Sequence, residues 1–427
     1  MPRDVEFRDE DDPNLWAKPE VKEYRIKLVT PMFGGGAVAG EPDAAMPIRA
    51  TAIRGQLQFW WRATRGAALP LEEMRRRHQE VWGSTERASP VKVEVDDVKA
   101  SLPVACGRYE GNAPRITWTS PFSGTSLPYA LFPFQGVNTG PDHKRKPPAK
   151  CVHEASFTLR VRCEPPLKED VDAALWAWVN FGGLGARTRR GCGALWCEDF
   201  SPRPGKVEEW FRTNAALHLR FSTARDRPTL LGKLFARREA GPPLKVWDRW
   251  LTGLLQRFRQ GAEFARTRHQ GRSLYPEPET IRRMTGRRSA RHQRMEGIDD
   301  RAFPRAELGL PIIFQFKDEK AGDPQKTSLQ PLVAGKPGER MGSPLILKPL
   351  AVSPTQAVPM IVRLIAPAPD AVVLMDGKKE VGQLGPDAIR DPRLATPGSP
   401  LAASHAGSAL EAFLAFARND GFQEVIA

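Results

Sequence analysis

Residues 181–195 read FGGLGARTRRGCGAL and combine five glycines with three arginines. Glycine lets the backbone approach a ligand closely, and arginine offers its charge to phosphate oxygens. This pattern predicts phosphate contacts by Gly183, Gly185, Arg187, Arg189 and Arg190. The segment lacks the Gly-Lys-Ser/Thr of a P-loop, and no GxGxxG follows a predicted strand, so nucleotide hydrolysis and dinucleotide binding are not indicated. We call residues 181–195 the Gly-Arg loop.

A second glycine-rich segment, TPMFGGG at residues 30–36, directly follows a predicted strand. Its three consecutive glycines, Gly34, Gly35 and Gly36, permit a turn without a Cβ penalty. They can also bring backbone N–H groups close to a ligand. We therefore predict that Gly34, Gly35 and Gly36 contribute to RNA binding.

The run PIRATAIRGQLQFWWRATRG, residues 47–66, predicts an amphipathic helix over residues 53–65. At 100° per residue its basic side chains form one stripe, and its aromatic and apolar side chains form the neighbouring stripe. We expect the two tryptophans of this run to lie in the core. The basic candidates are Arg49, Arg54, Arg62 and Arg65. Two roles stay open for them: contact with nucleic acid, or bracing of neighbouring loops.

Short alternating runs and helical periodicity favour an α+β protein. The predicted strands are residues 24–30, 91–95, 155–161, 311–316, 343–349 and 360–366. Besides the helix over residues 53–65, helices are predicted over residues 171–180, after a cap at Asp170, and over residues 408–418. A strand, a helix and further strands, repeated in split form, are typical of a ferredoxin-like fold.

The charge of the chain is concentrated in one segment. The 427 residues include 64 Lys and Arg against 50 Asp and Glu, and this net charge of +14 indicates an anionic partner. Residues 201–294 alone sum to +14, so the rest of the chain is neutral. This basic segment holds a predicted helix over residues 244–260 and a predicted loop over residues 282–294. Solvated helix faces and a phosphate-contacting surface are both open interpretations.

The sequence predicts a cytoplasmic protein without a membrane partner. No run of 18 apolar residues occurs, and the first residues, MPRDVEFRDEDDPN, are acidic where a signal peptide is basic. The five cysteines form no CxxC pair, so we expect packed thiols rather than disulfides or a zinc ribbon. No His, Cys or carboxylate cluster has the spacing of metal ligands, and no cofactor is expected.

Several of these segments together resemble a known family. The Gly-Arg loop looks like the glycine-rich loop of the RAMP superfamily of CRISPR proteins. VWGSTERASPVKVEV, residues 81–95, resembles the Phe-Gly-Ser…Ser-Pro-strand segment of that family, with Trp82 in the aromatic place. Residues 30–36 and 47–66 are similar to the first RAMP subunit of the Cmr complex, the type III-B effector. Residues 308–316 and 339–350 resemble the second half of that subunit.

The resemblance implies two ferredoxin-like, RRM-related domains with helical insertions. A composition shift places the boundary near residue 200, which gives an acidic tail over residues 1–20 and domains over residues 21–200 and 201–427. The resemblance also implies a non-catalytic subunit that binds the 3′ part of guide RNA beside other Cmr RAMP subunits and helps capture target RNA. No RNP-like aromatic strand is found, so binding is expected to depend on arginine, backbone amides and shape.

Two other functions stay open. A metal-independent RNA endonuclease would need a base near neutral pKa and a cationic stabiliser. The best candidate is His143 in the loop PDHKRKPPAK, which also carries the candidate RNA contacts Lys144 and Arg145. The third possibility is a scaffold that contacts only protein.

Overall fold

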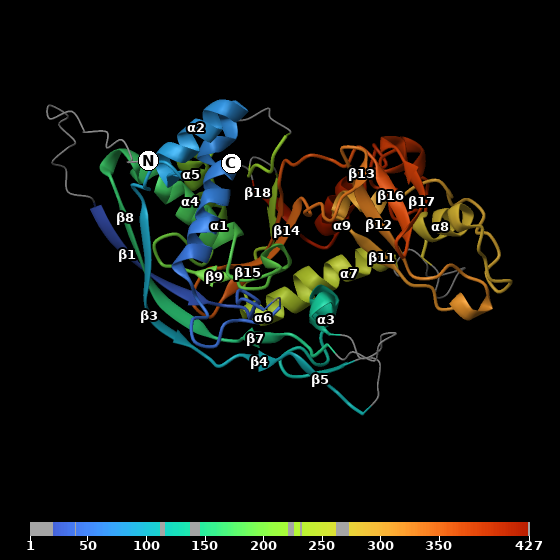
Figure 1. Ribbon diagram of the computed structural model, residues 1–427, viewed down its shortest axis with the longest axis horizontal. Helices are drawn as coiled ribbons and strands as arrows, with labels where there is room; N and C mark the ends of the chain where they lie inside the picture. Colours follow the sequence, from blue (N-terminus) through green and yellow to red (C-terminus); the bar gives the residue numbers. More distant parts are fainter. Residues whose placement is uncertain are drawn as a thin grey trace.

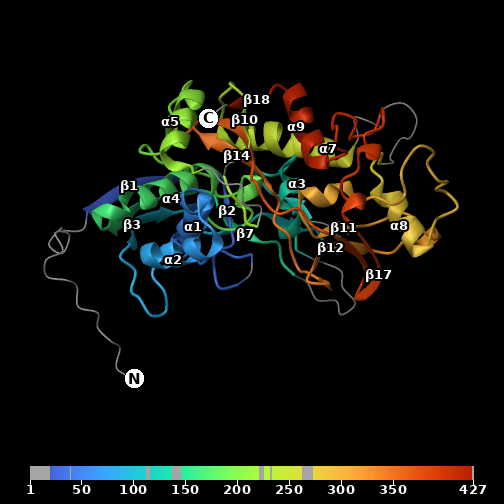
Figure 2. The same cartoon turned by 90° about the horizontal axis from the view of Figure 1, so that it is seen from above.

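A computed structural model describes residues 20–38, 40–111, 116–136, 146–220, 226–230, 233–261 and 273–425. The chain folds as a mixed α/β protein whose strand pairs, in the described residues, are antiparallel (Figure 1). Two four-stranded sheets organise it, and a five-stranded sheet lies at the opposite end of the molecule from the first (Figures 1 and 2). We call residues 20–220 the first module and residues 226–425 the second module.

The first module is built on a sheet with the spatial strand order β3-β8-β1-β9. Its strands are β1 (Glu20–Leu28), β3 (Lys92–Ala100), β8 (Ala155–Cys163) and β9 (Leu195–Trp196). Helix α1 (Ala50–Ala63) follows β1, and helix α4 (Lys168–Phe181) follows β8. Strand, helix, two strands, helix and strand therefore succeed one another along the chain.

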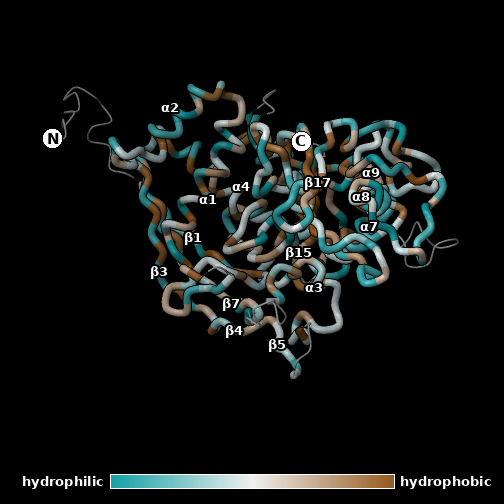
Figure 3. Tube along the Cα trace, turned by 45° about the vertical axis from the view of Figure 1, so that its right-hand side comes forward, coloured by the Kyte–Doolittle hydropathy of each residue, from teal (hydrophilic) through white to brown (hydrophobic). Residues whose placement is uncertain are grey.

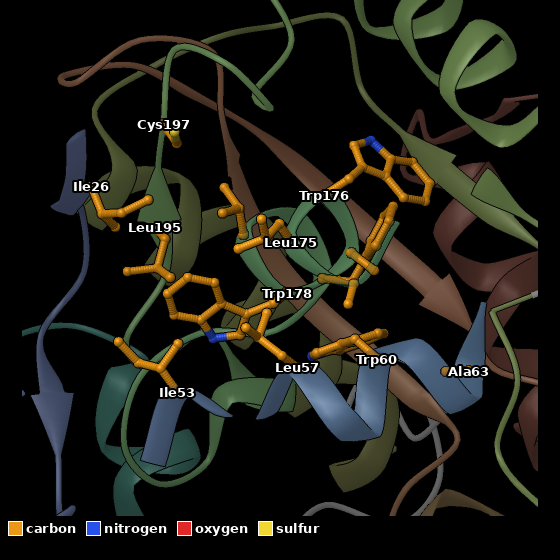
Figure 4. Packing of buried hydrophobic residues seen from close by; sticks show 14 of the residues in the cluster. Ile26, Ile53, Leu57, Trp60, Ala63, Leu175, Trp176, Trp178, Leu195 and Cys197 are labelled. Atoms are coloured by element: carbon orange, nitrogen blue, oxygen red, sulfur yellow. The ribbon is translucent and has the colours of Figure 1, made fainter. Parts of the chain in front are cut away.

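The two helices cover one face of this sheet. In Figure 4 Leu57 and Trp60 of α1 and Trp178 of α4 meet beside Ile26 of β1 and Leu195 of β9. These side chains are buried because the apolar positions of β1 and β8 alternate with polar ones, so that one face of each strand can enter the core. Figure 3 shows this alternation of hydrophilic and hydrophobic residues along β3.

The second module is built on a sheet with the order β14-β15-β10-β18. Its strands are β10 (Leu234–Ala236), β14 (Leu345–Ala351), β15 (Ala357–Arg363) and β18 (Gln423–Val425). Helices and three strands of the five-stranded sheet occupy the chain between β10 and β14. The other two strands of that sheet follow β15, and α9 (Ala409–Asn419) comes after them and precedes β18. The sequence of elements along the chain thus repeats that of the first module, with a large insertion.

Both faces of the second sheet are buried, as β14 shows with seven buried residues in succession. Ile346 and Met360 share a core with α1 and α4 of the first module. Leu347 and Ile361 share a core with α7 and α9 on the other side. The molecule is therefore layered as sheet, helices, sheet, helices, and the helices of the first module lie between the two sheets.

The remaining elements surround these layers. The five-stranded sheet consists of β11 (Ile312–Phe314), β12 (Thr327–Val333), β13 (Lys336–Pro337), β16 (Val372–Asp376) and β17 (Lys379–Leu384). One small sheet consists of β2 (Met32–Phe33), β4 (Val104–Ala105) and β7 (Lys150–Val152). The other consists of β5 (Gly107–Tyr109) and β6 (Ile116–Trp118). The other helices are α2 (Leu71–Trp82), α3 (Leu127–Leu131), α5 (Val207–His218), α6 (Pro243–Lys245), a π-helix (Val246–Thr252), α7 (Gly253–Gln260) and α8 (Glu277–Thr285).

Three local predictions need correction. Asp170 was expected to cap α4 but lies inside the helix, where its carboxylate accepts hydrogen bonds from Trp61 Nε1 at 2.7 Å and Arg77 Nη2 at 2.9 Å. These partners hold the carboxylate in the core. The first helix ends at Ala63 rather than residue 65, because Thr64 leaves the helical conformation at φ −116° and ψ −88°. The predicted loop over residues 282–294 begins inside α8, which ends at Thr285.

Other predictions are confirmed. The helix over residues 244–260 is present as α6, the π-helix and α7 in succession. Each predicted strand overlaps an observed one, with boundaries that shift by a few residues. The five cysteines are buried and free, as packed thiols should be.

Candidate nucleic-acid interface

The two glycine-rich segments lie against each other. The N–H of Ala186 in the Gly-Arg loop donates to the carbonyl of Phe33 at 2.7 Å. A Cβ at Gly185 would meet that same carbonyl oxygen at 2.3 Å, so the contact requires glycine. On the other segment, an Arg49 guanidinium nitrogen donates to the carbonyl of Gly35. The structure therefore brings Gly34, Gly35, Gly36 and Arg49 beside the Gly-Arg loop.

The Gly-Arg loop is closed on itself by its glycines. The N–H of Leu184 donates to the carbonyl of Gly193 at 3.0 Å, and Thr30 Oγ1 donates to the carbonyl of Gly191 at 2.7 Å. Gly193 has φ +63°, and a Cβ there would lie 1.9 Å from the Leu184 oxygen. Between these closures Arg187 takes the left-handed conformation at φ +59°, which begins the short turn that carries Arg189 and Arg190.

Arg189 and Arg190 join the two modules. Arg189 Nη1 donates to the carbonyl of Ser343 at 2.6 Å, and Arg190 Nη1 donates to that of Leu345 at 2.8 Å. The carbonyl of Arg190 accepts in turn from Trp247 Nε1 of the π-helix at 2.6 Å. Burial, together with nearby arginines, lowers the pKa of Arg190 to about 9. The side chains of these two candidate RNA contacts thus form hydrogen bonds that join the two modules.

Arg187 stands apart from its two neighbours. Its Nε is buried and has no hydrogen-bond partner within the described residues. Burial lowers the pKa of Arg187, and the charges of Arg259 on α7 and Arg340 ahead of β14 lower it further. In the part of the chain that the structure describes, no carboxylate lies within ion-pair distance of these three side chains. We call Arg187, Arg259 and Arg340 the arginine cluster.

The arginines of the first helix have partners within the protein. Arg54 Nη1 donates to Ser89 Oγ at 3.1 Å and to the carbonyl of Val91 at 3.0 Å, which braces the loop before β3. Arg62 contacts His78 at 3.0 Å, and Arg65 pairs with a carboxylate of α4 at 2.8 Å. Lys144 and Arg145 lie outside the described residues.

Several arginines of the strongly basic segment are paired with carboxylates. In its second half Glu279 pairs with both Arg282 at 2.9 Å and Arg288 at 2.8 Å. Arg291 pairs with Asp318 at 3.4 Å, and Arg294 pairs with Asp300 at 2.9 Å. Arg282 is also held by Asp323 at 3.0 Å. These arginines brace the insertion of the second module, and their charge is not free to attract an anion.

The outer face of the first sheet is charged rather than aromatic. Arg160 of β8 pairs across the strands with Glu23 at 2.6 Å and with Asp96 at 2.9 Å. Trp196, in register with Lys27, is the aromatic residue on this face among the described positions of the four strands. Because the other sheet is buried on both sides, neither sheet offers a platform on which several bases could stack.

The described residues hold no group of three or more His, Cys, Asp and Glu side chains that could bind a metal ion. Within the same residues no helix is long and apolar enough to cross a membrane.

The RAMP superfamily model matches residues 25–196, from β1 through the Gly-Arg loop to β9. The predicted resemblance to this family is therefore confirmed over these residues, and we call residues 25–196 the RAMP domain.

Known proteins of the same family resemble the chain at low identity. The CRISPR system Cmr subunit Cmr1-2 of Pyrococcus furiosus is 24% identical over 183 residues, which make up 40% of this chain and 92% of that protein. The crystal structure of Cmr1 from Pyrococcus furiosus in the apo form covers 95% of this chain and 98% of its own, with 14% identity and a TM-score of 0.47. A cryo-EM structure of the type III-B Cmr-beta bound to cognate target RNA covers 81% of this chain and 94% of its own, with 13% identity and a TM-score of 0.44.

The RAMP domain supplies only part of the candidate interface. Arg187 comes from the RAMP domain, whereas Arg259 and Arg340 come from the second module and are absent from the sequence-based candidates. Both lie in stretches that the sequence analysis discussed, residues 244–260 and 339–350, but only the packing of the second module on the Gly-Arg loop brings these two side chains to it. The candidate interface is therefore formed by both modules where they meet.

Lys348 of β14 is a further residue that the sequence did not single out. Its ammonium is buried and donates to the carbonyls of Val179 at 2.6 Å and Gly182 at 2.9 Å, at the end of α4 where the Gly-Arg loop begins. Burial lowers the pKa of Lys348 to about 7. The second module thus fixes the start of the RAMP domain's loop with a buried cation.

This burial predicts a pH dependence of stability. Between pH 7 and the ordinary lysine pKa of 10.5 the folded state binds fewer protons at Lys348 than the unfolded chain. The contribution of Lys348 to the free energy of unfolding therefore rises with pH in this window, by up to about 1.4 kcal/mol per pH unit. Denaturant unfolding of the wild type and Lys348→Met at several pH values should show a difference that grows in favour of the wild type as pH rises. Lys336→Met, at an exposed lysine, is the control, and its difference from the wild type in free energy of unfolding should not change with pH. The same constant difference for Lys348→Met would contradict this account.

Proposed function

We propose that the chain is a non-catalytic RNA-binding subunit of a type III-B CRISPR effector complex. In this proposal it binds the 3′ part of the guide RNA and helps capture target RNA, beside other Cmr RAMP subunits. The observation that carries the proposal is the arginine cluster, whose charges have no carboxylate partner in the described residues and lie beside two glycine-rich segments. Unpaired arginines and open backbone suit phosphate oxygens.

The partners follow from the relatives that the chain resembles. The curated relative is a Cmr subunit, and one of the similar solved structures is a Cmr-beta complex bound to cognate target RNA. The first name agrees with neighbouring Cmr subunits for this chain, and the second agrees with an RNA ligand.

We also propose that both modules are ferredoxin-like. Support comes from the topology of the two sheets. When the strands of each module are numbered in chain order, both sheets have the spatial order 2-3-1-4. In both modules a helix precedes the second strand and another precedes the fourth strand. The tail over residues 1–20 precedes the first of them. Phe211 and Ala215 of α5 pack in the core of the first module, so we place the boundary after His218 rather than near residue 200.

Two of the described histidines, His78 and His218, are poorly suited to act as a general base. Burial, with the charges of Arg62 and Arg54, lowers the pKa of His78 to about 4, and burial with Arg65 does the same for His218. Both imidazoles are neutral at pH 7 and are weak bases, whereas a general base works best with a pKa near the working pH. His143 lies outside the described residues, so the endonuclease hypothesis is decided by experiment.

The proposal predicts salt-dependent RNA binding without cleavage. Filter binding of labelled single-stranded RNA to the full chain should weaken steeply with salt, with a log-log slope of roughly −2 from the three arginines of the cluster. The RNA should remain intact at neutral pH. RNA cleavage that His143→Ala abolishes would establish the endonuclease instead. Absence of binding at low salt, both alone and in the assembled complex, would favour the scaffold.

A further inference from the structure

A pocket of about 340 Å³ opens in the second module, next to the arginine cluster. Three of its lining residues, Pro344, Pro367 and Pro369, form a rigid apolar wall together with Leu410 at the start of α9. The opposite side carries cationic side chains and one carboxylate. Such a pocket, with a mixed polar and apolar lining that includes cationic side chains, has the size and character of a site for a small organic anion.

The carboxylate in the pocket, Glu307, does not oppose an anion. Its Oε1 accepts from Arg390 Nε at 2.8 Å and from Arg390 Nη2 at 2.5 Å. Its Oε2 accepts from Ser408 Oγ at 2.7 Å and from the N–H of Leu410 at 3.2 Å. Glu307 is 4% exposed, and its charge is fully taken up by these four donors.

One cationic side chain of the pocket has no hydrogen-bond or ion-pair partner among the described residues. Lys233 pairs with Glu424 at 3.3 Å. Arg363, at the end of β15, forms no side-chain hydrogen bond or ion pair with any residue that the structure describes. Its place is fixed, because its backbone N–H donates to the carbonyl of Lys233 at 2.7 Å. Arg363 therefore presents a free guanidinium beside the proline wall.

The pocket and the arginine cluster share one segment of chain. Arg340 of the cluster is followed by Met341, which lines the pocket. The carbonyl of Ser343 is held by Arg189 of the Gly-Arg loop at 2.6 Å, and the next residue, Pro344, belongs to the proline wall. The chain from Arg340 to Pro344 thus connects the arginine cluster to the lining of the pocket.

We infer that this pocket takes one nucleotide of the bound RNA strand, an inference that rests on the proposed function. The guanidinium of Arg363 holds its phosphate, and the prolines and Leu410 contact the sugar and base. Apolar contact of this kind tolerates any base, so the pocket fixes the position of the strand rather than its sequence.

The test compares affinities of the full chain for a labelled oligouridylate. Arg363→Gln should weaken binding roughly fivefold and reduce the salt slope by about 0.7, the contribution of one phosphate contact. Ala368→Trp, at an exposed position on the rim of the pocket, should weaken binding without changing charge, because the indole fills the space. Arg418→Gln is the matched control, since Arg418 pairs with Glu424 at 3.1 Å outside the pocket lining, and should leave affinity unchanged.

The outcomes separate this inference from the proposed function. If both pocket variants bind RNA like the wild type while substitution of Arg187 weakens binding, the pocket inference is wrong and the proposed function stands. If they bind RNA normally but assemble poorly with neighbouring subunits, the pocket belongs to an acidic protein segment, which also overturns the inference. If Arg187 has no effect and the pocket variants do, the interface proposed at the junction is wrong.

Discussion

Arg187→Glu should weaken RNA binding by roughly tenfold to a hundredfold, without loss of folding. The new carboxylate would lie close to Arg259 and Arg340, which have no carboxylate partner in the described structure, and should pair with them. The net charge of the arginine cluster then falls from three positive charges to one, so the attraction for phosphates is largely lost. Filter binding at fixed salt and circular dichroism of the same sample measure the two effects.

Arg291→Glu is the matched control for this substitution. It makes the same change in net charge, but Arg291 is 74% exposed and already paired with Asp318. Its effect on affinity should be within about threefold. Equal losses for the two variants would mean that RNA responds only to the overall charge of the protein, and the arginine cluster would have no special role.

Gly193→Ala should destabilise the protein by about 3 kcal/mol or more and abolish RNA binding. The added Cβ would lie 1.9 Å from the carbonyl oxygen of Leu184, at a residue with φ +63°. The backbone contact that closes the Gly-Arg loop must therefore break, and the loop cannot hold Arg187 in place. Thermal unfolding measures the stability, and binding is measured well below the midpoint.

Gly205→Ala separates the two causes of this loss. Gly205 has a similar φ of +74°, but a Cβ there meets no atom within 4 Å. The substitution should therefore cost about 1 kcal/mol from the left-handed conformation alone, and RNA affinity should not change. If Gly193→Ala is no more harmful than Gly205→Ala, the closure of the loop by Gly193 is not needed.

Much of the fold was predictable because local patterns decide it. The alternation in β8 and the helical period of α1 and α4 depend on neighbouring residues, and these elements appear where they were predicted. Asp170 shows where local signals fail. An acidic residue near a helix start resembles a cap, but its partners Trp61 and Arg77 are distant in sequence and only packing places them.

The candidate site was predictable only in part for the same reason. Composition identified both glycine-rich segments, and the structure brings them together. Charge counting pointed to residues 201–294, yet carboxylates that lie beyond the segment, such as Asp300 and Asp318, neutralise several of its arginines. Arg340 lies in residues 339–350, which resemble the family, but its role in the site depends on the packing of β14 beside the Gly-Arg loop.

The most direct test of the account is photo-crosslinking of the protein, in its native complex, to guide RNA of known register. Peptides that carry crosslinked nucleotides are then identified by mass spectrometry. The account predicts crosslinks in residues 183–191 and 34–36 and around Arg340, all from nucleotides in the 3′ part of the guide. Crosslinks confined to the outer face of the first sheet, around Arg160, or to the basic segment around Arg291 would contradict it.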